Sequence, residues 1–230
     1  MSTDSKVVVG IVLLSLTIFL GISFFVGREN KKHDEKDNFV NKELLHIQSD
    51  DWVKGNPEAK VTLVEYLDFE CEACGAYYPF VKQLSEELKD DLKVVARYFP
   101  LPGHKNGLPA ALAVEAAGRQ GKFWEMHDIV FENQAQWGEK QTLDSKIFEE
   151  YAQKIGLDMV KFREDVNSQS VKDRVQRDVD SGIKLGNTGT PSFYLNSQKI
   201  QNIRSYEEFK TLIQAEIFKA SESQTDSLEE

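Results

Sequence analysis

Two cysteines, Cys71 and Cys74, are the only ones in the 230-residue chain, and just Glu72 and Ala73 separate them. Disulfide scaffolds of small secreted folds use four, six or eight cysteines, so one close pair is not a scaffold. The pair follows an apolar run, 61–69, and precedes a helical pattern. Cys71 is therefore predicted at a helix N-terminus, where the helix dipole stabilises a thiolate. This arrangement is typical of thiol–disulfide exchange.

The composition limits the classes of partner. The formal net charge is -10 and 40% of the residues are hydrophobic. An acidic chain without a basic face argues against nucleic acid as a partner. The hydrophobic content is sufficient for one domain with a buried core.

The N-terminal segment has a different character. Residues 7–26 carry no charge and are mostly Val, Ile, Leu and Phe, and a run of ~20 apolar residues is long enough to span a bilayer. The alternative is a cleaved signal peptide, whose apolar core is usually ~7–15 residues long and ends at a small-residue cleavage site. We expect an uncleaved membrane anchor at 1–27.

Two arguments lead to opposite orientations of this anchor. Arg28, Lys31 and Lys32 follow the run, and the positive-inside rule would place the following domain in the cytoplasm. Disulfide chemistry instead favours the outside of the membrane, where disulfides persist. We expect a single-pass protein of the cell membrane with its catalytic domain extracytoplasmic.

The remainder of the chain divides into a charged linker at 28–51, a main domain at 52–220 and a disordered acidic tail at 221–230. Predicted strands and helices alternate, so the domain is expected to be α/β with a helical insertion at about 104–186. The predicted strands are 61–69, 92–99, 192–195 and 199–200. The predicted helices are 70–89, 108–118, 123–133, 144–155, 159–166, 171–185 and 205–220.

Four segments carry a family resemblance: 64–74 with the CxxC, 95–101, 123–128 and 189–193, which reads Gly-Thr-Pro-Ser-Phe. Over 52–220 the chain resembles the DsbA-like thiol–disulfide oxidoreductases of the thioredoxin superfamily, in particular their membrane-tethered bacterial members. The resemblance implies a thioredoxin-like fold with a helical insertion. A CxxC alone is a weak signal, but its combination with the distant Gly-Thr-Pro segment is specific.

The resemblance also implies roles for the distant loop. Pro191 is expected to follow a cis peptide bond and to face the cysteines, and Thr190 is expected to present its backbone to an extended substrate, as an added strand does. The alternative is that Pro191 merely begins an edge strand.

The chemistry is expected to need no cofactor beyond a redox-active Cys71–Cys74 disulfide. A substrate thiolate attacks the Cys71 sulfur, and Cys71 later leaves as a thiolate. The strongest oxidants of the family carry Pro-His between the cysteines, whereas this chain carries Glu72-Ala73. The Glu72 carboxylate is expected to raise the Cys71 pKa and make a weaker oxidant.

Glu65 lies six positions before Cys71 on the same predicted strand. By resemblance, it is expected to be buried behind the disulfide and to relay a proton to or from Cys74. The alternative is a structural pair with Arg97 on the neighbouring strand. Asp68 and Glu70 are expected to be solvated or to cap the helix.

Two histidines raise the question of a metal. Together with both cysteines, His104 and His127 would make four zinc ligands, but their spacing matches no compact zinc site. His127 is expected to pack in the aromatic face of the insertion. We therefore predict no metal.

The leading functional hypothesis is an oxidase that introduces disulfides into cysteine-containing exported proteins. By resemblance, a membrane quinone-linked partner would reoxidise it, and the protein is expected to be a monomer. One alternative is a disulfide reductase or isomerase on the same scaffold. Another is a tethered binding or chaperone module without catalysis.

Overall fold

The computed structural model describes residues 42–138, 140 and 146–226, and the chain from Leu44 onward forms one compact unit. The anchor predicted at 1–27 and the first part of the predicted linker lie outside the described residues. Among the helices that are described, none is both long and apolar enough to cross a membrane.

A five-stranded sheet forms the centre of this unit. Its strands are β1 (Trp52–Gly55), β2 (Val61–Leu67), β3 (Leu92–Tyr98), β4 (Ser192–Leu195) and β5 (Gln198–Ile200), in the order β1-β3-β2-β4-β5. β2 and β3 are parallel, and the other pairs are antiparallel. Because β2 has a neighbour on each side and is covered on both faces, its sequence is almost continuously apolar.

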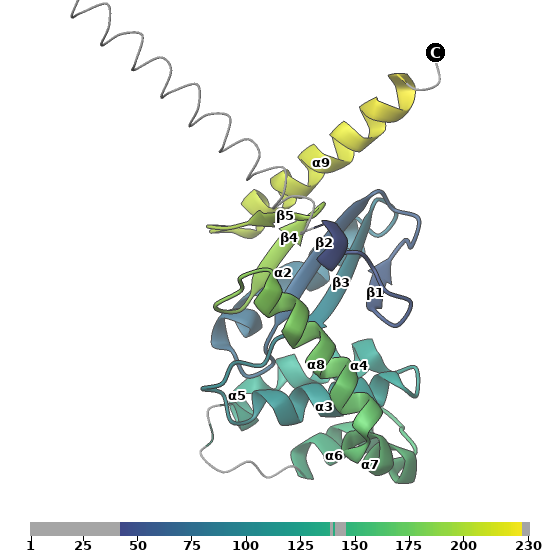
Figure 1. The fold of residues 1–230 in the computed structure, drawn as a ribbon, viewed down its shortest axis with the longest axis vertical. Coiled ribbons are helices and arrows are strands. Elements are labelled where there is room, and N and C mark those ends of the chain that lie inside the picture. Colours follow the sequence, from purple (N-terminus) through teal and green to yellow (C-terminus); the bar gives the residue numbers. More distant parts are fainter. Residues whose placement is uncertain (1–41, 139, 141–145, 227–230) are drawn as a thin grey trace, which may run out of the picture. The chain divides into compact units, whose positions relative to one another are not determined.

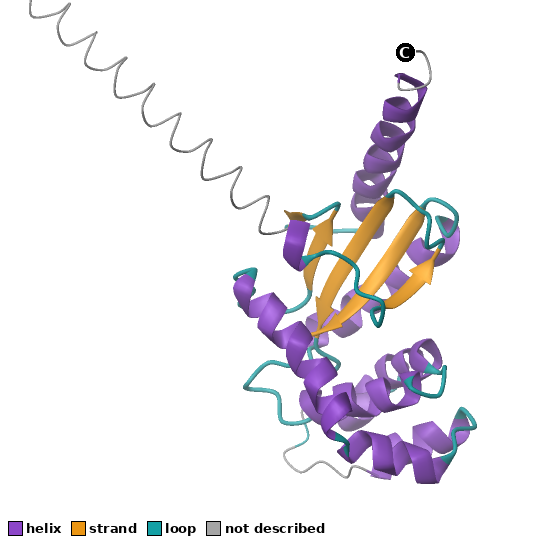
Figure 2. Cartoon of the chain, turned by 45° about the vertical axis from the view of Figure 1, so that its right-hand side comes forward, coloured by secondary structure: helices purple, strands orange, loops and turns teal. Residues whose placement is uncertain are grey.

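Helices cover both faces of the sheet (Figure 2). Leu63 packs in one cluster with residues of α2 (Glu72–Glu87) and α9 (Tyr206–Asp226). Its neighbour Val64 packs in another cluster, which includes Val179 of α8 (Gln169–Lys184). The alternation of side chains along a strand thus sends successive β2 residues to opposite helical layers.

The predicted insertion is a helical subdomain between β3 and β4, at one end of the sheet (Figure 1). It begins with α3 (Gly107–Gly118), whose alanines are buried against the other helices. The remaining helices before α8 are α4 (Phe123–Glu132), α5 (Gln134–Trp137), α6 (Lys146–Lys154) and α7 (Met159–Asn167).

A buried charge network joins the segment before β1 to the sheet and to α8. The Asp51 carboxylate pairs with Arg97 of β3 at 2.8 Å and with Arg174 of α8 at 3.1 Å. Arg174 also pairs with Asp178 at 2.6 Å. Arg97 donates to the Leu44 carbonyl as well, so residues 44–51 are docked on the domain. The last part of the predicted linker therefore lies against the domain.

Two short elements and one helix end differ from expectation. β1 and α5 were not predicted, because four residues are too few to show a period. α9 continues to Asp226, where a disordered tail was expected from residue 221. The polar composition of this segment does not prevent helix formation once α9 has been started by packing against the sheet.

Candidate functional site

Cys71 and Cys74 lie at the junction of β2 and α2. Cys71 is the N-cap residue of α2, and Cys74 lies in its first turn. Both are free thiols, and Cys71 is 8% exposed whereas Cys74 is fully buried. The predicted helix N-terminus therefore leaves Cys71 slightly exposed and buries Cys74 completely.

This asymmetry separates the acidities of the two thiols. A hydrogen bond from Cys74, one involving Thr190, and the backbone N–H groups of Cys74 and Ala73 together lower the Cys71 pKa to about 5, although burial opposes them. Burial, with the nearby Cys71 and Glu65 charges, raises the Cys74 pKa well above its usual value. Glu72 is exposed, so solvent screens its charge, and the expected rise in the Cys71 pKa is not found.

The loop before β4 faces Cys71. The Thr190–Pro191 peptide bond is cis, and the Cys71 thiol donates to the Thr190 carbonyl at 3.4 Å. The buried Thr190 hydroxyl oxygen has no hydrogen-bond partner among the described residues, so it is free to donate to a Cys71 thiolate. Pro191 does not begin an edge strand, because β4 starts at Ser192 and pairs with both β2 and β5.

An open groove of about 350 Å³ adjoins this loop. Residues 188–193 form one wall and 199–203 another, and Tyr77 of α2 contributes a third side. The groove is next to the reactive sulfur because Thr190 both lines it and contacts Cys71. An extended chain lying there would pass close to Cys71.

Glu65 of β2 is 4% exposed, and burial raises its pKa to about 8. Its charge contributes to the raised pKa of Cys74. The alternative pairing with Arg97 is wrong, because Arg97 lies beside Tyr66 and pairs with Asp51 on the opposite face of the sheet.

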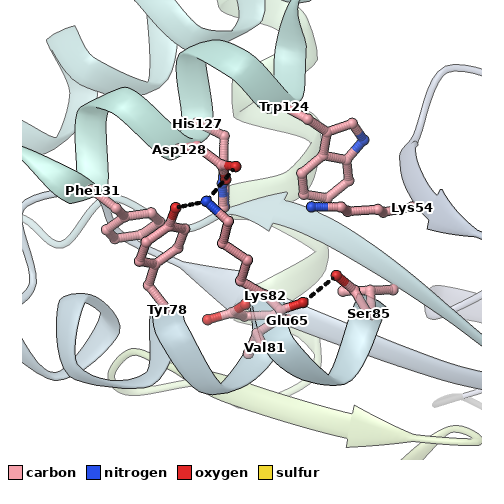
Figure 3. A pocket seen from close by; sticks show the side chains of 11 residues that line it. Lys54, Glu65, Tyr78, Val81, Lys82, Ser85, Trp124, His127, Asp128 and Phe131 are labelled. Carbon is pink, nitrogen blue, oxygen red and sulfur yellow. Dashed lines mark hydrogen bonds and ion pairs between the residues drawn. The ribbon is translucent and has the colours of Figure 1, made fainter. Parts of the chain in front are cut away.

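Glu65 lines a small pocket together with the polar side chains of Lys82 from α2 and of His127 and Asp128 from α4 (Figure 3). The pocket measures about 10 Å³, which is room for about one water molecule. His127 contacts Asp128 at 3.1 Å, and Asp128 pairs with Lys82 at 3.1 Å. These three side chains line the same pocket as Glu65.

Asp68 and Glu70 are buried rather than solvated, so of the two expected alternatives only capping remains. The Glu70 carboxylate accepts from the backbone N–H groups of Asn106 at 2.5 Å and Gly107 at 2.8 Å. It thus caps α3 rather than its own helix. Gly107 also permits the close approach of Asp68, because a Cβ atom at position 107 would collide with the Asp68 carboxylate.

Two further contacts of the cysteine loop were not predicted. Asp68 binds His104, with 2.6 Å between its Oδ2 and the histidine Nδ1. Gln134 of α5 donates to the Cys71 carbonyl. For the contact of His104, the sequence offers one signal, which is its position just after the Pro-rich end of β3. For the contact of Gln134, the sequence offers no signal.

The two histidines lie in different surroundings. His104 pairs with Asp68, whereas His127 packs among aromatic rings, including Phe69 and Trp124, which confirms its expected packing role. Within residues 42–138, 140 and 146–226, no group of three or more His, Cys, Asp or Glu side chains could hold a metal ion.

Comparison with known proteins agrees with this architecture. The family described as Thioredoxin matches residues 48–215. Wolbachia pipientis alpha-DsbA1 has a similar structure, with a TM-score of 0.71 and 22% identity over 80% of this chain and 99% of that one. The structure of Bacillus subtilis BdbD is also similar, with a TM-score of 0.65 and 25% identity over 72% of this chain and 91% of that one.

The similar curated proteins are much longer. A protein named Na(+)/H(+) antiporter NhaA from Herminiimonas arsenicoxydans is 37% identical over 151 residues, which are 66% of this chain and 23% of that protein. NhaA 1 of Salinispora arenicola is 38% identical over 150 residues, which are 65% of this chain and 22% of that protein. The chain thus spans less than a quarter of these relatives. By its matched segment, which is more than half of the chain, it belongs to the thioredoxin family.

Proposed function

We propose that the chain introduces disulfides into exported proteins through Cys71 and Cys74, as a protein disulfide oxidoreductase. The observation that carries the proposal is the slightly exposed Cys71 with a pKa of about 5, whose thiol contacts the Thr190 carbonyl, beside a fully buried Cys74. A low thiol pKa stabilises the reduced protein and so makes its disulfide a better oxidant.

The reaction transfers two electrons from the substrate to the protein. A substrate thiolate attacks Cys71 of the Cys71–Cys74 disulfide, and Cys74 leaves with the electron pair of the broken bond. A second substrate thiolate then attacks the substrate sulfur of the mixed disulfide, which releases Cys71 as a thiolate and leaves the substrate with a disulfide. One substrate proton goes to Cys74 and the other to solvent.

Glu65 is proposed to relay the proton of Cys74. A carboxyl with a pKa of about 8 can hold a proton near neutral pH and give it to a departing thiolate. Its burial beside Cys74, with a pocket large enough for about one water molecule, supports this role.

Substrate binding is proposed at the groove beside Thr190 and Pro191. An unfolded substrate has free backbone groups that would pair with this loop, as in strand addition. Glu72 and Ala73 are both exposed and are proposed to form the active-site rim that meets the substrate.

The proposed setting is the outer side of the cell membrane, with residues 1–27 as a single anchor. The uncharged run at 7–26 and the persistence of disulfides outside the cytoplasm support it. A quinone-linked membrane protein is proposed to reoxidise the pair, since the chain has no second pair of cysteines. We propose a monomer with no cofactor other than its own disulfide.

The test is the reduction potential of the full-length chain in detergent, titrated in glutathione buffers and followed by thiol alkylation. A value near or above about -180 mV supports an oxidase, and a value near about -270 mV supports a reductase instead. A Cys71→Ser, Cys74→Ser double variant is the control. Absence of exchange with a dithiol peptide would leave only a binding module.

The location needs a separate test. A reporter that is active only outside the cytoplasm, fused after residue 230, should be active in cells. Activity of a reporter that works only in the cytoplasm would overturn the proposed orientation.

A further inference from the structure

The groove beside Thr190 carries a positive charge. Of the described residues that line this groove, Lys199 of β5 is the only charged one, and it is exposed. It forms no ion pair with a carboxylate within the described part of the chain. The whole chain has a formal net charge of -10, so this cation does not belong to a generally basic surface. The groove therefore presents an unpaired positive charge to whatever lies in it.

Neutral groups hold the Lys199 ammonium in place. Its Nζ atom donates to Asn187 Oδ1 at 3.0 Å and lies 5.7 Å from the centre of the Tyr194 ring. The same Asn187 oxygen accepts from the Tyr194 hydroxyl at 2.6 Å, and Asn187 is buried. Asn187 directly precedes Thr188, which lines the groove. Because an ammonium has three N–H donors, this arrangement fixes Lys199 and leaves two of its donors for a ligand.

A short extended segment can reach from the reactive sulfur to this cation. The Cys71 thiol contacts the Thr190 carbonyl, and Lys199 lies directly opposite Tyr194 in the β4–β5 pair. Tyr194 is four positions after Thr190, so their Cα atoms are at most ~14 Å apart. A substrate that extends along the groove from Cys71 therefore brings a residue about four positions from its own cysteine to Lys199.

We infer that Lys199 is a specificity-determining residue, which favours exported proteins with an Asp or Glu within about four residues of the cysteine that they present to Cys71. The inference rests on the proposed exchange function and names the substrate class of its groove. A carboxylate accepts from the free donors of Lys199 and carries the opposite charge. It takes no part in the transfer of electrons, and it holds the substrate with its cysteine beside Cys71.

The test uses the full-length chain in its disulfide form and two dithiol peptides of identical composition. In the near peptide, one Asp stands about three residues outside each cysteine, and in the far peptide the same residues stand about ten residues outside. Both peptides have the same net charge, so the acidic chain as a whole repels both. At physiological salt, exposed charges more than ~8 Å apart are largely screened, so only the near Asp residues respond to Lys199.

The measured quantity is the single-turnover rate constant of peptide oxidation, expressed as a ratio of the near to the far peptide. An Asp also affects the acidity of the peptide's own thiols, and comparison of this ratio between protein variants removes that effect. We expect the ratio to be about twofold to fivefold higher for the wild type than for Lys199→Gln, because an exposed ion pair contributes modestly.

Two further variants separate charge from structure. Lys199→Glu should lower the ratio below that of Lys199→Gln, because a carboxylate in the groove repels the near Asp residues. Lys161→Gln, which removes an exposed lysine of α7, is the matched control and should keep the wild-type ratio. Equal ratios for the wild type, Lys199→Gln and Lys199→Glu, with all three proteins folded, would overturn the inference.

Failure of the wider proposal gives a different result. If the wild type oxidises neither peptide, the proposed exchange function fails. Fluorescent near peptides with serine at both cysteine positions then test the groove alone, by anisotropy. Tighter binding of the Asp peptide than of its Asn version by the wild type, but not by Lys199→Gln, would support recognition by Lys199. Equal binding of the two peptides by the wild type would overturn it.

Discussion

Gln134 holds the backbone of Cys71 from the helical insertion: its Nε2 atom donates to the Cys71 carbonyl at 2.9 Å and to the Phe69 carbonyl at 2.7 Å. Gly75 makes room for it, because a Cβ atom there would collide with the Gln134 amide. The insertion therefore fixes the position of the reactive loop as well as covering the end of the sheet.

Replacement of Gln134 by alanine should destabilise the protein by about 1–3 kcal/mol, because two partly buried carbonyl groups lose their donor. Chemical unfolding in urea measures the change in the free energy of unfolding. Gln136→Ala is the control, since Gln136 is exposed and bonds only to its helix neighbour Asn133. Equal stabilities of the two variants would contradict the assigned role of Gln134.

Alkylation of the reduced protein should distinguish the two cysteines. The Cys71 thiolate forms as pH rises through about 5, so its reaction rate should be half-maximal near that pH and level above about pH 7. Cys74 should stay unmodified, because it is buried and its pKa is raised. Mass spectrometry of peptides locates the label, and preferential labelling of Cys74 would reverse the assignment.

Replacement of Cys74 by serine should trap a mixed disulfide between Cys71 and a substrate, because the buried resolving thiol is lost. Cys71→Ser should trap none. Non-reducing gel electrophoresis detects the adduct, which should disappear on addition of a reductant. Adducts formed equally well by both variants would show that Cys71 is not the attacked sulfur.

Glu65 should make stability depend on pH in a defined window. Its pKa is about 8 in the folded protein against an ordinary 4.5, so the folded state binds more protons than the unfolded state between these values. In the disulfide form, in which Cys71 does not titrate, the contribution of Glu65 to the stability should therefore fall as pH rises from about 4.5 to about 8, and the full cost of the buried charge applies above that. Glu65→Gln should remove this fall and be more stable than the wild type at about pH 9.

The measurement is the free energy of unfolding across that pH range. Glu58→Gln, which changes an exposed glutamate, should leave the slope unchanged. A Glu65→Gln protein with the wild-type slope would show that another group titrates.

Replacement of Arg174 by methionine should cost about 3–5 kcal/mol, because it leaves the buried carboxylates of Asp51 and Asp178 without their shared cation. Arg163→Met is the matched control, since Arg163 pairs with Glu149 at the surface, and it should cost only about 0–1 kcal/mol. Thermal unfolding ranks the two variants, and a similar small loss for both would show that the buried network adds little.

Apart from β1 and α5, the sequence by itself determined the order of strands and helices, the helix N-terminus at Cys71 and the α/β class with its insertion. These depend on patterns within a few residues: an apolar run, a 3.6-residue period and a Gly-Thr-Pro turn. Each of these elements forms in any tertiary arrangement that buries its apolar side, so local chemistry was enough to predict it.

Only the tertiary structure decided which distant groups meet. Asp68 contacts His104, Glu70 caps α3, and Arg97 turns to Asp51 rather than to Glu65. A polar side chain carries no local signal of its partner, because the partner is chosen by which faces of the strands and helices pack together. The alternation of side chains along a strand can be predicted from the sequence. The sequence does not show which segment of the chain packs against each face of the sheet.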